Sequence, residues 1–380
     1  EAGQKLGANG VAVGALAGTH QQGQDNVFLG NAAGFGSALF NGVQSSTFCV
    51  AVGFQAGEDL TSGDYNSLVG YQAGNEITTG NYNTVLGGGA LSVVTTGSYN
   101  TAVGRGASSQ SPANVIRTTS LGYQAAYYGG SRSTSVGDLA GLYQTGEYNT
   151  FLGASAGAGS NAYRISEEVA ASRNVGIGYA SLYNLAGGGY NTAIGRWSGK
   201  DLTTGSYNVL LGNAAGEAMT TGIKNVVLGA GAGQNITTGS NNIFIGNDSG
   251  SEFFNGNNVT IIGSFDGNTT SSPNVNAAAY AGAVVISSND PNNSTPLLFM
   301  EKNGSVSLPA STGLWSASNG GFKFQNVDGT KVLKWARSSS AVSSIKAFEF
   351  YGSTGSVIGS LQSTSTGISI SYTSDYRLKE

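Results

Sequence analysis

Two glycine-rich strings have the composition of a phosphate-binding loop. They are LGAGAG at 228–233 and GRWSGK at 195–200. A phosphate loop needs two glycines at a fixed spacing, then Lys and Ser or Thr, between a strand and a helix. GRWSGK lacks that spacing and the hydroxyl residue, and both strings lie in register with a repeat. We therefore interpret both as parts of the repeat, and the sequence predicts no cofactor.

Other residues with reactive side chains are isolated. His20 is the single histidine and has no Cys or His near it, so no metal site is expected. Carboxylates are scattered singly, so the pair needed for glycoside hydrolysis is not visible. The single Cys49 cannot form an internal disulfide and stands in the apolar string FCVAVG, where a small buried hydrophobic role is expected. We predict that the chain is not an enzyme.

Large aromatic residues gather near the C-terminal end. Trp and Tyr at the tip of a fibre are natural contacts for a receptor or glycan. They can equally form the core of a small domain, because large aromatics dominate small cores. Both interpretations stay open, and the predicted receptor-binding residues are Trp315, Phe322, Trp335 and Tyr351.

An internal repeat in the sequence predicts the secondary-structure elements that position these residues. Its anchor is a Gly preceded by Val, Leu or Ile, usually with Asn four residues before it. Eight of the fourteen gaps between anchors are 17 residues, and the rest run from 15 to 25. Such a period indicates a stacked repeat architecture. The anchors are at 14, 30, 53, 70, 87, 104, 122, 137, 153, 178, 195, 212, 229, 246 and 263.

Each repeat consists of three short pieces. They are N-x-x-[aliphatic]-G, then G-x-x-[Ala/Ser], then [aliphatic]-T-T-G, as in NTVLG at 83–87. Each piece is too short for a helix, and the Val, Ile, Thr and Gly content indicates short strands joined by tight turns. The sequence predicts an all-β protein, a β-solenoid of about fifteen coils and roughly 70 Å in length.

The strands are apolar on both faces. In NIFIG at 242–246, Ile243 and Ile245 point one way and Phe244 points the other. One face can fill the coil, but the other needs a cover, because a strand that is apolar on both faces is buried on both. No helix in the sequence could supply it. We therefore predict that two further copies of the chain supply it, in a homotrimer around a threefold axis.

Two residue types, Asn and Tyr, recur at fixed positions of the repeat and would form columns along the coils. The recurring Asn predicts hydrogen-bonded ladders along the coils. Tyr precedes that Asn at 65, 82, 99, 148, 190 and 207, which favours packing between coils or chains over sugar stacking.

The two long gaps between anchor glycines, 30–53 and 153–178, are interpreted as surface loops, with a binding loop as the alternative.

Charge and hydropathy exclude several partners. The net charge of −4 and the 10% content of charged residues do not indicate the basic surface that nucleic-acid binding requires. No apolar run reaches the ~18 residues of a membrane span, so no membrane insertion is expected. Because the chain begins at Glu1 without Met, we expect a fragment or a processed product.

The domain organisation follows from the end of the repeat. We predict a roll at 1–267, a linker or neck at 268–281 and a smaller C-terminal β domain at 282–373. That last region alternates short strands with turn signals such as Asn-Gly and Asp-Gly. Residues 374–380 belong to none of these.

The final string TSDYRLKE, at 373–380, resembles the start of the chaperone-of-endosialidase domain. The resemblance implies a homotrimeric fibre assembled by a C-terminal intramolecular chaperone that then releases itself by cleavage. It implies that Ser374 is the nucleophile at the Ser374–Asp375 junction and that Lys379 activates it. Nearly all of that domain is missing from the sequence, so no cleavage is expected of this chain.

The repeat N-[TV]-x-[LIV]-G-x-x-[AS] resembles the head repeats of YadA-type trimeric adhesins, which are also common in phage tail fibres. The resemblance implies a left-handed parallel β-roll, although the unit here is longer. The expected function is a phage tail fibre that attaches to a cell-surface receptor, a glycan or a protein, with glycan favoured. The alternatives are a bacterial surface adhesin of the same construction and a polysaccharide depolymerase with an inter-subunit site. Each places the protein outside the cell, on a virion or a bacterial surface.

Overall fold

The computed structural model describes residues 6–36, 44–159, 171–266 and 282–287, and seven strands between 296 and 372. Strands and turns account for this described part, which contains no helix. The chain divides into two compact units, Glu1–Ser294 and Thr295–Glu380. The predicted linker at 268–281 and the chaperone-like residues 374–380 lie outside the described residues.

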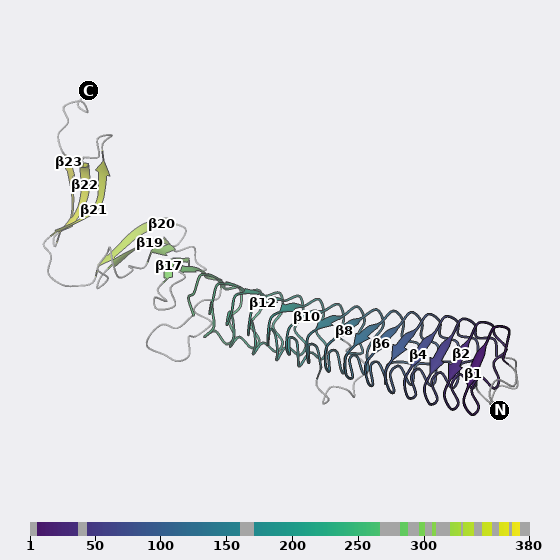
Figure 1. Ribbon diagram of the computed structural model, residues 1–380. Coiled ribbons are helices and arrows are strands. Elements are labelled where there is room, and N and C mark those ends of the chain that lie inside the picture. The colour runs from purple at the N-terminus through teal and green to yellow at the C-terminus, as the bar shows by residue number, and fades with distance from the viewer. Residues whose placement is uncertain are drawn as a thin grey trace, which may run out of the picture. The chain divides into compact units, whose positions relative to one another are not determined.

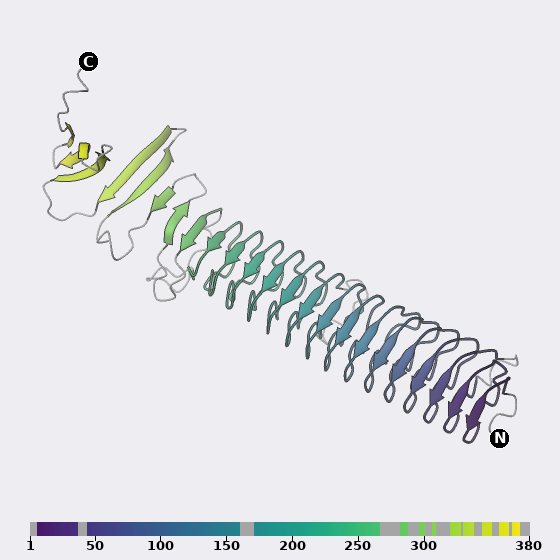
Figure 2. The same ribbon diagram turned by 45° about the horizontal axis from the view of Figure 1, so that its top comes forward.

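The first unit is a stack of coils with one strand in each (Figures 1 and 2). Each strand pairs in parallel with the strand of the next coil, as in Val209↔Val226. The predicted β-solenoid is confirmed. The strands are β1 Val11–Val13, β2 Val27–Leu29, β3 Val50–Val52, β4 Ser67–Val69, β5 Thr84–Leu86, β6 Thr101–Val103, β7 Thr119–Leu121, β8 Thr134–Val136, β9 Thr150–Leu152, β10 Val175–Ile177, β11 Thr192–Ile194, β12 Val209–Leu211, β13 Val226–Leu228, β14 Ile243–Ile245, β15 Thr260–Ile262 and β16 Val284–Ser287.

The parallel sheet continues beyond the last anchor glycine. β16 pairs with β15 in the same register as the other strands, with Ile262 opposite Ile286. Ser287 then stands where an anchor Gly would be expected. The roll therefore has a strand at 284–287, inside the stretch predicted as the C-terminal domain.

Only the first of the three predicted pieces of each repeat forms a strand. The other two are turns, yet their backbone still bonds from coil to coil. Thr203 N donates to Thr220 O at 2.9 Å, and Gly199 N donates to Ala215 O at 2.9 Å. Backbone hydrogen bonds therefore continue around the coil, although regular strand geometry is confined to three residues.

Left-handed backbone conformations explain why the turns are not strands. In the coil from Gly195 to Gly212, five residues have positive φ: Gly195 (134°), Trp197 (58°), Gly199 (56°), Tyr207 (61°) and Gly212 (142°). The anchor glycines stack on one another, and a Cβ on Gly212 would collide with the carbonyl oxygen of Gly229. The anchor must be Gly for both reasons, conformational and steric.

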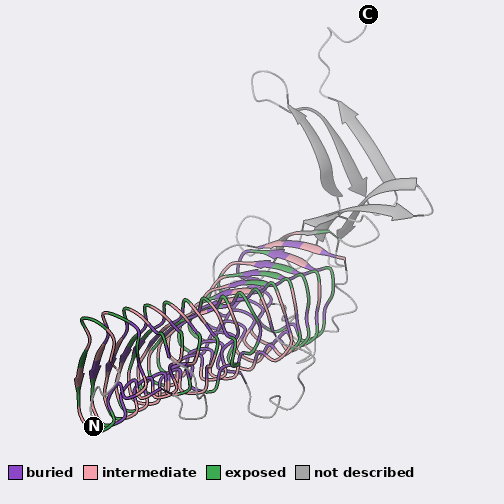
Figure 3. Ribbon diagram, turned by 90° about the vertical axis from the view of Figure 1, so that its right-hand side faces the viewer, coloured by how far each residue is buried: buried purple, intermediate pink, exposed green. Residues whose placement is uncertain are grey.

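The interior of the roll is filled by three columns of small and aliphatic side chains, with phenylalanine in some coils. In one coil these are Leu210 from the middle of the strand, Ala215 from the first turn and Met219 from the second, all fully buried. Figure 3 shows the buried stretches running along the coils. Sizes compensate between coils, since Phe151 packs beside Gly176, where a Cβ would approach its ring to 3.0 Å. The recurring Ala or Ser three residues after the anchor is thus a packing requirement.

The predicted asparagine ladder is present and buried. Asn208 Nδ2 donates to Asn191 Oδ1 at 3.0 Å and to Gly222 O at 2.8 Å. Its backbone N also donates to Asn191 Oδ1, at 3.0 Å, and its own Oδ1 accepts the same pair of bonds from Asn225. Both donors and the oxygen of the Asn208 amide are thus paired inside the roll, as those of a buried amide must be.

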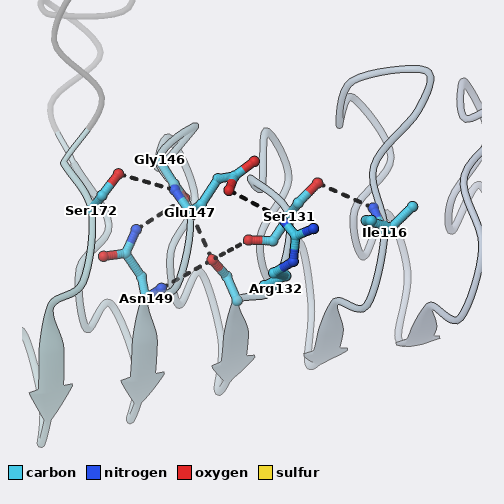
Figure 4. A network of polar contacts seen from close by, with 8 residues as sticks. Ile116, Ser131, Arg132, Gly146, Glu147, Asn149 and Ser172 are labelled. Carbon is cyan, nitrogen blue, oxygen red and sulfur yellow. Dashed lines mark hydrogen bonds and ion pairs between the residues drawn. The ribbon is translucent and has the colours of Figure 1, made fainter.

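Other residues occupy the ladder position before five of the fifteen anchors, the first being Gly10, which precedes the ladder. Cys49, Thr118 and Ser133 replace Asn inside the ladder, and Val259 ends it by donating its backbone N to Asn242 Oδ1 at 2.9 Å. Ser133 accepts the backbone N of Asn149 at 3.1 Å. Figure 4 shows the polar contacts around this break, including Ser172 Oγ accepting from Glu147 N.

The second unit consists of antiparallel strands. β19 and β20 pair along their whole length, from Gly320↔Arg337 to Val327↔Thr330. The predicted Asp-Gly turn at 328 and 329 lies outside the described residues. β22 pairs with both β21 and β23. The strands are β17 Pro296–Met300, β18 Val306–Leu308, β19 Gly320–Val327, β20 Thr330–Arg337, β21 Ser344–Tyr351, β22 Val357–Thr364 and β23 Gly367–Tyr372.

The requirement for glycine at the anchor can be tested by a substitution that adds one methyl group. Gly212→Ala should lower the free energy of unfolding by about 2–4 kcal/mol, through left-handed strain and the collision with Gly229 O. Gly88→Ala is the matched control, because a Cβ there meets only Tyr71 O, at 3.8 Å. Thermal unfolding followed by circular dichroism measures both, and equal midpoints for the two variants would contradict the stacking argument.

Candidate functional site

The outer face of the parallel sheet carries an unbroken row of aliphatic side chains. The middle residue of each strand points inward, so the first and third residues point outward. Leu86 is 50% exposed, Leu152 46% and Leu228 43%. We call this row the aliphatic stripe; it comprises Val13, Leu29, Val52, Val69, Leu86, Val103, Leu121, Val136, Leu152, Ile177, Ile194, Leu211, Leu228, Ile245, Ile262 and Ile286, all exposed or half-buried.

A second row on the same face is rich in threonine. Thr84, Thr101, Thr119, Thr134, Thr150 and Thr192 are the first residues of their strands. In the part of the chain that the structure describes, their hydroxyls make no hydrogen bond to protein. The turn threonines differ, since Thr203 Oγ1 donates to Thr220 O at 3.0 Å. The face therefore offers methyl groups and free hydroxyls at strand spacing, about 4.8 Å.

An aromatic column borders this face. Its members stand five residues before the anchor, where the backbone is left-handed. Tyr65, Tyr82 and Tyr99 stack with ring centres 5.0 and 5.1 Å apart, and Arg117 extends the stack over Tyr99 at 5.5 Å. The aromatic column comprises Phe48, Tyr65, Tyr82, Tyr99, Arg117, Arg132, Tyr148, Arg173, Tyr190 and Tyr207.

Stacking of the rings determines which of their surfaces in the aromatic column are available to a partner. The face of each ring lies against its neighbour, so the prediction that Tyr packs between coils is confirmed. Tyr82 is nevertheless 48% exposed. Because the faces are covered, the column offers ring edges and hydroxyls to a partner. Stacking of aromatic pairs contributes about 0.5–1.5 kcal/mol each, which offsets the cost of holding a bulky residue in a left-handed conformation.

The predicted receptor-binding aromatics are only partly brought together. The register places Phe322 of β19 directly opposite Trp335 of β20. Tyr351 ends β21, which belongs to a separate three-stranded sheet. Trp315 lies outside the described residues, as do Ser374, Asp375 and Lys379. The receptor-binding role of these residues stays a prediction.

The single histidine of the roll packs against an aromatic ring, and three carboxylates lie near one another. His20 packs edge-to-face against Phe35 at 4.9 Å. Burial, together with Glu58 and Glu76, raises the pKa of Asp59. Within the described residues there is no group of three or more His, Cys, Asp or Glu that could hold a metal ion. The same residues include no helix long and apolar enough to cross a membrane.

Cys49 is buried as predicted, but its position is more specific than a hydrophobic site. It occupies the ladder position between Asn26 and Asn66, and its backbone N donates to Asn26 Oδ1 at 2.9 Å. Its Sγ donates to Gly63 O at 3.2 Å. Burial raises the pKa of the Cys49 thiol to about 11, so the thiol is neutral and unreactive at physiological pH.

Sequence reasoning missed one cluster. GRWSGK was weighed only as a phosphate loop, and Trp197 and Arg196 within it were set aside with the repeat. The available signal was the size of Trp197, because the coils on either side carry Ala180 and Ala214 at that position.

Comparison of the chain with family models, with curated proteins and with solved structures gives no match. The class of the molecule therefore rests on its own architecture, which is a parallel β-solenoid with an exposed aliphatic stripe.

The raised pKa of Cys49 predicts a pH dependence of stability. The folded pKa of about 11 lies above the thiol's ordinary value of 9.0, so the contribution of Cys49 to stability is complete below pH 9 and is lost as the pH rises toward 11. Between pH 8 and pH 10.5 the wild type should lose roughly 2 kcal/mol more of its free energy of unfolding than Cys49→Ser. Urea titrations at both pH values measure this difference. Equal losses in the two proteins would show that the thiol ionises freely in the folded chain.

Proposed function

We propose that this protein is a homotrimeric fibre that attaches to a cell-surface receptor, with a glycan as the favoured receptor. The aliphatic stripe carries the proposal. One chain alone leaves this row of Val, Leu and Ile exposed or half-buried along every coil. Contiguous apolar surface of this extent marks an interaction surface.

The size of the stripe suits a second and third copy of the chain. Sixteen strands at about 4.8 Å make a face roughly 70 Å long, and three residues make it about 10 Å wide. The resulting area, roughly 700 Å² per chain, is close to the ~800 Å² that each partner buries in a stable interface. A copy of the same chain has the same coil spacing, so every stripe residue meets an equivalent one.

A threefold arrangement fits a stripe that is narrow compared with its length. Three rolls side by side bring three stripes to one axis, and each chain stays exposed on its other sides. In this proposal the coils are left-handed, as in the YadA-type repeats that the sequence resembles. The aromatic column then lies at the border between chains, where Tyr hydroxyls and Arg side chains can contact the neighbouring copy.

Attachment by such a fibre would rely on repetition. Three identical sites on one trimer bind a crowded cell surface with an avidity well above that of each site. The stack of backbone hydrogen bonds from coil to coil keeps the roll extended, so that binding residues are held away from the fibre's point of attachment. The protein acts outside the cell, on a virion tail or a bacterial surface.

The trimer is tested by placing charge on the stripe. Leu228→Lys, alone and with Leu152→Lys, should convert the trimer to monomers, because the lysine would be buried among apolar side chains. Thr221→Lys, on an exposed turn away from the sheet, is the matched control. Light scattering coupled to size exclusion gives the mass. A wild-type mass of 38.3 kDa, with a folded circular dichroism spectrum, would refute the trimer.

The receptor is tested by a glycan array and by binding of the fluorescent protein to bacterial cells. Wild type should bind a limited set of glycans, and Trp335→Ala should weaken that binding at least tenfold if β20 carries the site. Phe299→Ala on β17 serves as a control for changes in the same unit. Normal binding by a folded Trp335→Ala variant would remove β20 from the receptor site.

A further inference from the structure

Trp197 stands at a backbone position that disfavours it. The residue two after the anchor is left-handed along the roll, with φ of 58° at Trp197, 60° at Leu16 and 56° at Leu139. A bulky residue in that conformation costs energy, and Trp197 is the largest side chain that the described coils place there. The neighbouring coils carry Ala180 and Ala214 there, and both are buried. Stacking within a column therefore does not explain Trp197, as it explains the tyrosines.

The indole of Trp197 holds a guanidinium group. Arg196 Cζ lies 3.3 Å from the centre of the Trp197 ring. Arg196 is exposed, and no ion pair engages it in the described part of the chain. Its planar group therefore rests on the ring with its charge unmatched. A stacked guanidinium keeps its N–H edges free, and its orientation is fixed before any ligand arrives.

The other nearby cation is already paired. Lys200 Nζ lies 5.6 Å from the Trp197 ring, but it also lies 3.5 Å from Glu217 Oε1 and 3.9 Å from Asp201 Oδ1. These two carboxylates offset the lysine charge. Arg196 is thus the group that remains available to an anion.

An exposed tyrosine completes the cluster. Tyr179 follows the anchor of the preceding coil, as Arg196 follows its own anchor, and the parallel register of β10 and β11 sets the two positions side by side. Parallel strands are separated by about 4.8 Å. Tyr179 is 54% exposed, and no ring stack covers it within the described residues. Its ring can take the apolar face of a sugar, as aromatic linings of ligand sites do.

We infer that Tyr179, Arg196 and Trp197 form a binding site for an acidic sugar. The carboxylate of the sugar would accept two parallel hydrogen bonds from Arg196, the geometry for which guanidinium is suited. The sugar ring would pack on Tyr179, and Trp197 would hold the guanidinium in place. This inference rests on the proposed attachment function; it names carboxylate-bearing saccharides as the receptor class and places a site on the roll.

The chain contains its own control for charge and position. Arg105 also follows an anchor, and its Cζ lies 5.8 Å from the ring of Tyr123 in the next coil. The residue after Arg105 is Gly106, so no indole orients the guanidinium. Arg105 and Tyr123 thus reproduce the arginine and the tyrosine without the tryptophan.

The experiment is a calorimetric titration of the full chain with matched saccharides. The acidic probes are 3′-sialyllactose and a hyaluronan tetrasaccharide, the neutral probes are lactose and chitotetraose, and inorganic phosphate is a separate arm. At least one acidic probe should bind at least tenfold more tightly than its neutral partner. Arg196→Lys and Trp197→Ala should each remove about tenfold of that affinity, while Arg105→Lys should leave it unchanged. The unfolding midpoint of each variant shows whether it is folded.

Several results would overturn the inference. They are equal affinity for acidic and neutral probes, an equal loss in Arg105→Lys and Arg196→Lys, or competition by millimolar phosphate as effective as by the acidic sugar. Cell binding by the same variants separates this inference from the proposed function. Cells bound normally by Arg196→Lys would leave attachment standing and remove this site from it. Tight acidic-sugar binding by a chain that binds no cells would do the reverse.

Discussion

The buried asparagine ladder is the interaction on which the rest of the roll depends. An amide that is fully buried must satisfy two donors and an acceptor, and the amide of Asn208 does so with the coil before it and the coil after it. This requirement sets the coils in register. Once they are in register, the anchor glycines stack, the strands pair, and the aliphatic stripe and the aromatic column run straight along the surface. The surfaces proposed for assembly and binding are therefore consequences of an internal hydrogen-bond pattern.

The sequence predicted the parts of the fold that depend on period. Strand positions, the buried Ala or Ser after the anchor and the Asn ladder all follow from spacing and residue type. Backbone conformation does not, because period says nothing about φ. The left-handed residues, among them Tyr82 and Trp197, carry side chains that sequence preference would exclude from that conformation. β16 was predicted as a strand but assigned to the C-terminal domain for a related reason, since it ends in Ser287 without an anchor Gly.

The candidate sites also divide into one that the sequence predicted and others that it did not. The aliphatic stripe was predictable, because alternation in a strand assigns residues to faces and both faces were apolar. The Arg196–Trp197 stack was not, since cation–ring contact between adjacent residues depends on the turn that separates their side chains. Register could have revealed the role of Cys49, which stands four residues before Gly53 just as Asn does before other anchors. Because cysteine is usually a small buried residue, only a packing role was predicted for Cys49.

The substitutions at Cys49, Thr118 and Ser133 also divide the ladder into lengths. An uninterrupted run extends from Asn149 to Asn242, and a shorter one from Asn66 to Asn100. In a linear stack, stability is a sum of units and of the couplings between nearest neighbours. Couplings are weakest where an amide is missing, so unfolding would advance in blocks that stop at these boundaries. The long run of amides is then the natural nucleus from which the remaining coils add one at a time, each using its predecessor as a template.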